Sequence, residues 1–146
     1  MKKLLLCLVA FATIAFVSCK KEKNPAEDFV GNYTVTATVH AQIPVLGAID
    51  QDLDAMDASI ALNGEEGNVT VSMAGQTTTG NVTEAGMTLQ PIVTTQTIMG
   101  TNVEVTITFP VISKPVNGVS SWTSNITASI NGIPLSGTAD MTATRK

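Results

Sequence analysis

The sequence predicts an all-β protein, a single small up-and-down antiparallel β-barrel of about eight strands. Apolar and polar residues alternate with a period of two in five runs, at residues 33–43, 69–73, 103–109, 122–130 and 135–143. Such alternation is typical of strands that have one buried and one solvent-facing side. Threonine, which favours strands, fills many of the polar positions. Turn signals separate the runs, so most strands are expected to pair with their neighbours in the sequence.

The predicted strands follow one another closely along the chain. After the first strand, residues 45–56 leave a short helix as an alternative, because four apolar residues approximate helical spacing there: Leu46, Ile49, Leu53 and Met56. A strand over 56–62 and a loop over 63–68 lead to strands over 69–73, 77–83 and 87–93. Strands 103–109 and 122–130 follow. Asn131-Gly132 then predicts a type I′ hairpin before the last strand, since both central residues of that turn have positive φ.

Strands with one apolar side must bury that side against each other. They do so by curling into a barrel or by stacking as two sheets. Successive hairpins favour the barrel, and a β-sandwich is the alternative. A porin-type membrane barrel is not expected, because it needs girdles of aromatic residues on its outer surface. Residues 29–146 hold only four aromatic rings, those of Phe29, Tyr33, Phe109 and Trp122.

Residues 1–18 are predicted to be a lipoprotein signal peptide. Lys2 and Lys3 provide a positive start, and an apolar run follows over residues 4–17. This pattern is typical of a secretory signal. The run is shorter than the roughly 20 apolar residues of a membrane-spanning helix. An ordinary secretory signal without lipidation is the alternative.

Cys19 is the predicted lipidation site. Residues 16–19 (Phe-Val-Ser-Cys) resemble a lipobox, in which a cysteine is acylated and becomes the first residue of the mature protein. Cys7 lies inside the signal peptide, so Cys19 would have no cysteine partner for an internal disulfide. Two or more acyl chains anchor a protein stably to a membrane. Because Lys20 rather than Asp follows, the resemblance to bacterial lipoproteins implies an outer-membrane lipoprotein of the cell envelope, on the periplasmic or the surface-exposed face.

Residues 19–28 are expected to be the lipidated cysteine and a flexible tether, and residues 29–146 the barrel domain. The tether is charged and lacks apolar periodicity. Its lysines either stay solvated or touch anionic lipid. From Asp28 onward the chain has three basic and ten acidic residues. A surface this negative argues against nucleic acid as a partner, since nucleic-acid affinity depends on Lys and Arg.

The sequence offers little for catalysis. The only histidine, His40, lies on the polar side of the first predicted strand, where a solvent-facing role is expected. No cysteine remains for nucleophilic attack, and no Gly-x-Ser-x-Gly motif is present. We therefore expect no catalytic residues, no cofactor and no enzyme, with a hydrolase as the third hypothesis.

An acidic run at Asp50, Asp52 and Asp54 is similar to the start of a calcium loop. An EF-hand would then need Gly at its sixth and Glu at its twelfth position, and this chain has Ala55 and Ala61 there. An acidic surface loop is expected, and no metal site is predicted. A different calcium loop, which would add Asp57, is the alternative.

Two segments carry a family resemblance. Residues 29–33 (Phe-Val-Gly-Asn-Tyr) and the closing hairpin over 126–143 resemble the calycin-like β-barrel lipoproteins of Bacteroidetes. Calycins include the lipocalins, in which a Gly-x-Trp motif begins the first strand and its aromatic ring plugs one end of the barrel. Gly31 and Tyr33 stand at the matching positions, with Tyr in place of Trp. The resemblance implies a lipocalin-like barrel and no particular activity.

The candidate ligand-binding residues are Tyr33, Phe109 and Trp122. They share parity with the apolar residues of their strands, so all three are expected to point inward. A barrel of about eight strands is either filled by side chains or holds one small ligand. We expect a membrane-anchored envelope lipoprotein whose barrel binds a small apolar ligand or a glycan. The alternative is a structural or interaction lipoprotein with a solid barrel and no small-molecule ligand.

Overall fold

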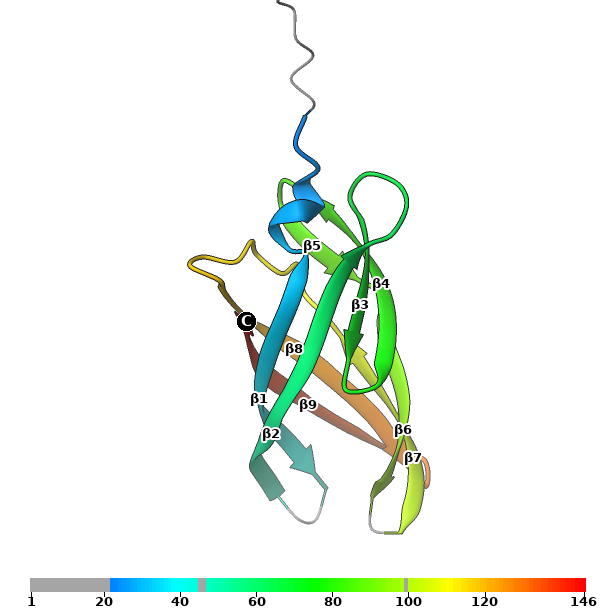
Figure 1. The fold of residues 1–146 in the computed structure, drawn as a ribbon. Helices are drawn as coiled ribbons and strands as arrows, with labels where there is room; N and C mark the ends of the chain where they lie inside the picture. Colours follow the sequence, from blue (N-terminus) through cyan, green and yellow to red (C-terminus); the bar gives the residue numbers. More distant parts are fainter. Residues whose placement is uncertain (1–21, 45–46, 99) are drawn as a thin grey trace, which may run out of the picture.

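The computed structural model describes residues 22–44, 47–98 and 100–146 (Figure 1). Within these ranges the chain forms one 3₁₀ helix, η1 (Pro25–Asp28), and nine strands. The described residues contain no helix that is long and apolar enough to cross a membrane. The prediction of an all-β fold is confirmed. The strands are β1 (Gly31–Ile43), β2 (Gly47–Leu62), β3 (Asn68–Met73), β4 (Gln76–Thr83), β5 (Gly86–Leu89), β6 (Ile92–Ile98), β7 (Thr101–Thr108), β8 (Val119–Ile130) and β9 (Ile133–Arg145).

All nine strands belong to one antiparallel sheet, in the order β5-β4-β3-β2-β1-β9-β8-β7-β6. Strands β1 and β9 are the first and last of the chain and lie side by side near the middle, paired from Tyr33–Arg145 to Gln42–Ser136. The sheet curls into a half-barrel (Figure 1). The prediction of a barrel-like fold is therefore confirmed. The alternative, a β-sandwich, would need two stacked sheets, and these strands form one continuous sheet.

The strand expected over 87–93 is split between the two edges of the sheet. Its first part, in β5, pairs with β4, and its second part, in β6, pairs with β7. Pro91 lies at the break, where it has no N–H to donate and its ring fixes φ. The β5 edge also contacts the connection between β7 and β8, where Met87 and Ile112 form an isolated bridge with two backbone hydrogen bonds of 2.8 Å. This bridge draws one end of the half-barrel together.

A short helix was the alternative for residues 45–56. For residues 47–56 this alternative is wrong, because they belong to strand β2. The register between β1 and β2 shifts between Val35, which pairs with Met56, and Ala37, which pairs with Leu53. Two residues of β2 thus oppose one of β1, which is a β-bulge. The extra residue puts Leu53 and Met56 on the same side although they are three apart in sequence. The bulge explains why a strand showed helical spacing.

The predicted turns are present. Asn131 and Gly132 connect β8 to β9 with φ values of 50° and 80°. Both values are positive, as a type I′ turn requires. The loop expected over 63–68 connects β2 to β3, with Asn68 as the first residue of β3. These turns bring successive strands into the antiparallel order that the alternation predicts.

Two clusters of buried side chains form the core. One lies beneath η1 and includes Ala26, Phe29 and Ile112, and the other lies on β1 and β9 and includes Tyr33 and Met141. Phe109 and Trp122 are partly buried and pack against both clusters. Since Ala26 is fully buried and Phe29 is 3% exposed, η1 and the residue after it close one end of the half-barrel.

Candidate functional site

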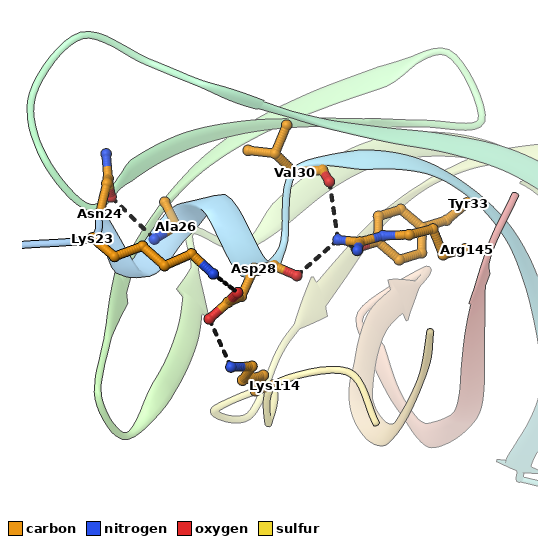
Figure 2. Close-up of polar contacts among 8 residues, drawn as sticks. All are labelled: Lys23, Asn24, Ala26, Asp28, Val30, Tyr33, Lys114 and Arg145. Carbon is orange, nitrogen blue, oxygen red and sulfur yellow. Dashed lines mark hydrogen bonds and ion pairs between the residues drawn. The ribbon is translucent and has the colours of Figure 1, made fainter. Parts of the chain in front are cut away.

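The closed end of the half-barrel is built from residues before β1, which were expected to belong to the flexible tether (Figure 2). The side-chain oxygen of Asn24 accepts a hydrogen bond from the N–H of Ala26 at 3.0 Å and one from the N–H of Gly67 at 3.2 Å. The first bond caps η1 and the second ties it to the loop before β3. The structure thus differs from the tether expectation over residues 24–28. The reason is that Ala26 and the apolar Phe29 find a buried surface beneath the turn.

Asp28 holds η1 to the opposite side of the barrel end. Its carboxylate lies 2.7 Å from Nζ of Lys114 and 2.5 Å from Nζ of Lys23 (Figure 2). Hydrogen bonds from Lys114 and Lys23 lower the pKa of Asp28 to about 2. The ion pairs are near the surface, where such pairs contribute little individually. Their effect is to orient η1 over the core.

Arg145, in β9, completes the closed end. Its Nη2 donates to the carbonyl oxygens of Asp28 at 2.7 Å and Val30 at 3.0 Å, and to the Tyr33 hydroxyl at 3.0 Å (Figure 2). The guanidinium also lies over the Tyr33 ring, 5.5 Å from its centroid. The Tyr33 hydroxyl in turn donates to the carbonyl of Phe29 at 2.6 Å. One arginine thus links the last strand to the segment that enters the first.

The three predicted ligand-binding residues lie around one cavity. Tyr33, Phe109 and Trp122 line it together with aliphatic side chains from β2, β3, β5 and β6. The cavity measures about 30 Å³. A cavity that binds benzene measures about 150 Å³, so this space is too small for an organic ligand. The structure confirms that these three side chains come together inside the barrel, and their ligand-binding role stays a prediction.

A second pocket lies at the opposite end of the half-barrel from η1. It measures about 180 Å³ and is partly open to solvent. We call it the mouth pocket; it is lined by Val39, Ala41, Gln42, Ile43, Val105, Ile126, Ala128, Leu135, Ser136 and Gly137. No charged residue contributes to it, and most of the lining is aliphatic. Alternation along the strands places the apolar residues of this lining on the inner side of the sheet, whereas Gln42 and Ser136 have the opposite parity.

Small residues create the space of the mouth pocket. Ala41 and Gly137 are paired neighbours across β1 and β9, and Ala128 faces the same pocket from β8. At Gly137 an added Cβ would lie 2.5 Å from the carbonyl oxygen of His40. A larger residue at that position would therefore push β1 and β9 apart. The sequence carries a signal for this pocket in the small residues at inward positions of β1, β8 and β9, but only the register between these strands shows that they cluster at one end.

His40 lies on the outer side of the sheet, as expected for the polar face of β1. Its Nδ1 is 2.7 Å from Asp50 on β2, and its Nε2 is 3.3 Å from Asp140 on β9. The hydrogen bond with the Asp50 carboxylate raises the pKa of His40, and Asp140 adds to this effect. Because carboxylates engage both ring nitrogens, neither is free to accept a proton from a substrate. The histidine therefore links three neighbouring strands.

The acidic run expected in a surface loop lies in a strand instead. Asp50, Asp52 and Asp54 belong to β2, whose ladder with β1 keeps the backbone extended. Asp52 accepts a hydrogen bond of 2.6 Å from the Thr38 hydroxyl on β1. In the described part of the chain, no group of three or more His, Cys, Asp or Glu side chains is arranged to hold a metal ion. An extended strand cannot wrap around a cation as a calcium loop does.

Sequence reasoning missed Arg145, Asp28 and the mouth pocket as organising features. Arg145 is one of only three basic residues after position 28, and that scarcity was the signal that could have pointed to it. Cys19 and the signal peptide lie outside the described residues, so their roles stay predictions. Comparison with known proteins finds no matching family model, curated protein or solved structure.

Proposed function

We propose that the protein is an outer-membrane-anchored envelope lipoprotein whose half-barrel binds a small apolar ligand in the mouth pocket. The observation that carries this proposal is the pocket itself, with about 180 Å³ of space and a mostly aliphatic lining. A cavity of about 150 Å³ with aliphatic walls accommodates a benzene-sized molecule. The pocket therefore suits a single ring or a short alkyl chain.

The lining favours an apolar ligand over a glycan. Sugar recognition requires several convergent hydrogen-bonding groups, and the side chains of the mouth pocket offer only Gln42 and Ser136. The aromatic rings on which a sugar could stack are those of Tyr33, Phe109 and Trp122. These rings line the small cavity near the closed end.

The proposed anchor suits this arrangement. The chain enters the domain at the η1 end, and the mouth pocket lies at the other end, near the tips of the β1–β2 and β8–β9 hairpins (Figure 1). A lipid on Cys19 would hold the closed end toward the membrane. The mouth would then face away from the membrane, where a ligand in the periplasm or at the cell surface could reach it.

Binding can be tested by titrating the purified protein with 1-octanol and with indole while recording amide chemical shifts. We expect shifts at the mouth pocket, with saturation. Val105→Trp fills the pocket and should abolish them. Val93→Trp is the matched control, because Val93 is an exposed residue on β6 outside the pocket lining. No saturable shift with either probe, or equal binding by both variants, would contradict the proposal.

The second candidate function is a structural or interaction lipoprotein without a small-molecule ligand. The small size of the cavity beside Trp122, about 30 Å³, favours it, because that part of the barrel is filled by side chains. Absence of octanol and indole binding would support this candidate.

The anchor is tested separately by Cys19→Ala. We expect this variant to leave the membrane fraction after a salt wash, because it lacks the residue that would carry the lipid. Wild-type protein should stay with the membranes. Retention of the variant in the washed membranes would show that Cys19 lipidation is not the anchor.

A further inference from the structure

One half of β2 has a strand neighbour on only one side. Strand β1 pairs with β2 along residues 47–60, but β3 pairs only with residues 58–62. Among the described residues, none pairs with positions 47–57 of β2 on the side away from β1. Figure 1 shows the β1–β2 hairpin extending beyond the turn that joins β3 and β4. We call residues 47–53 the free edge, because the bulge interrupts the regular register beyond Leu53.

The free edge has the chemistry of a site for an additional strand. In an antiparallel ladder, alternate residues turn their N–H and C=O groups away from the existing partner. Along the free edge these groups have no protein partner among the described residues. On the inner side, Ile49 and Leu53 are 38% and 41% exposed, although they are large aliphatic residues. A strand added beside β2 would pair the backbone groups and cover both side chains.

The negative charge of the free edge favours a basic strand as its binding partner. Asp50 and Asp52 lie within it and Asp54 adjoins it, and the Asp50 side chain is 74% exposed. No lysine or arginine occurs between residues 24 and 113. A second copy of this chain paired edge to edge would bring these carboxylates together, which is unfavourable. A strand with Lys or Arg at alternate positions would place opposite charges across the pair instead.

We propose that an extended, basic segment of a partner protein binds along residues 47–53 of β2 as an additional strand of the sheet. Its backbone pairs with the free edge, its Lys or Arg side chains lie on the outer side near Asp50 and Asp52, and its alternating apolar side chains cover Ile49 and Leu53. This site is the edge of β2. It is separate from the mouth pocket, so it does not depend on the proposed small-ligand function.

The test uses the full chain in non-ionic detergent and an eight-residue peptide of alternating Lys and Val. Two control peptides carry N-methyl groups, either on every valine amide or on every lysine amide. All three peptides have the same charge. In a strand, the amides of one alternate set point to the same edge. We therefore expect the unmethylated peptide and one methylated peptide to bind, and the other methylated peptide to lose binding. Equal binding of all three would overturn the proposal.

Two triple variants with the same change in net charge test the position of the site. D50N/D52N/D54N removes the acids of the free edge, and E65Q/E66Q/E84Q removes acids from turns elsewhere. At low salt we expect the first variant to bind the peptide about tenfold more weakly and the second to bind within about twofold of wild type. Equal weakening of both variants would show non-specific attraction and overturn the proposal.

Hydrogen exchange gives a readout that does not depend on substitutions. On wild-type protein, saturating peptide should slow amide exchange within residues 47–53 by about tenfold or more, because a new ladder protects outward-facing amides. Protection confined to other strands would overturn the proposal. Sedimentation of the peptide-free protein as a dimer protected at residues 47–53 would also overturn it, since a second copy would then be the occupant.

Discussion

Replacing Arg145 by methionine should loosen the closed end of the half-barrel. Arg145 Nη2 lies within hydrogen-bond distance of two backbone carbonyls and the Tyr33 hydroxyl. Methionine keeps the unbranched aliphatic stem and removes these donors and the charge over the ring. The carbonyls of Asp28 and Val30 would then rely on water, and the link between β9 and the segment before β1 would be lost.

The magnitude follows from the geometry. Hydrogen bonds to a charged group contribute about 1.5–3 kcal/mol in favourable cases, and an exposed cation over an aromatic ring adds about 0.5–1 kcal/mol. One nitrogen with two hydrogens serves all three acceptors, and Arg145 is exposed, so these values do not add in full. We expect a loss of about 2 kcal/mol in the free energy of unfolding. For a domain of this size that corresponds to a fall in Tm of about 8 °C.

Thermal unfolding followed by circular dichroism at neutral pH measures this loss. Lys146→Met is the matched control, because it removes a neighbouring charge whose partner Asp57 is 83% exposed. Pairs of this kind contribute at most about 1 kcal/mol. An Arg145→Met variant whose Tm falls no further than that of Lys146→Met would refute the reasoning that this arginine holds the end of the barrel.

Three further substitutions test the closed end, the bridge and the core. The ionised Asp28 carboxylate stabilises the folded state above about pH 4, and this stabilisation is lost as the pH falls toward the folded pKa of about 2. The urea midpoint of Asp28→Asn should therefore lie below that of wild type at pH 6, and the two midpoints should converge at pH 2. Gly86→Ala should lower the free energy of unfolding by about 3 kcal/mol, because the Cβ of the alanine would lie 2.4 Å from the carbonyl oxygen of Ile112. An unchanged urea midpoint would contradict this prediction. Ser124→Ala should lower the free energy of unfolding by about 1–2 kcal/mol, since Ser124 Oγ accepts a hydrogen bond of 3.1 Å from Trp122 Nε1. The urea midpoint and the Trp122 fluorescence should both change, and a variant as stable as wild type would show that this bond is dispensable.

The alternation along the chain was sufficient to predict the strands and their buried faces. Tyr33, Val35 and Ala37 are buried as their parity requires, and the Asn131-Gly132 turn has the positive φ values that its residue types predict. These features depend on neighbours within a few positions, so they can be recognised in the sequence. The bulge in β2 cannot be recognised in the sequence, because it exists only as a register shift between β1 and β2.

In the candidate sites, too, the sequence predicted which side chains point inward but not the size of the space between them. Parity predicted that Tyr33, Phe109 and Trp122 point inward, and they do line one cavity. The volume of that cavity, about 30 Å³, depends on how strongly the sheet curls and how side chains from eight strands fit together. Neither quantity can be obtained from residue types along one strand. The mouth pocket was missed for the same reason.

The sequence by itself determined the all-β class, the inner and outer faces of the strands and the tight turns, because each follows from local preferences and a period of two. The tertiary structure alone decided that residues 24–28 close the barrel, that Met87 of β5 pairs with Ile112 in the connection between β7 and β8, and that half of β2 keeps a free edge. Arg145 and Asp28 are 117 residues apart. Contacts over such distances arise only when the whole sheet has curled, because sheet order and curvature bring the partners together.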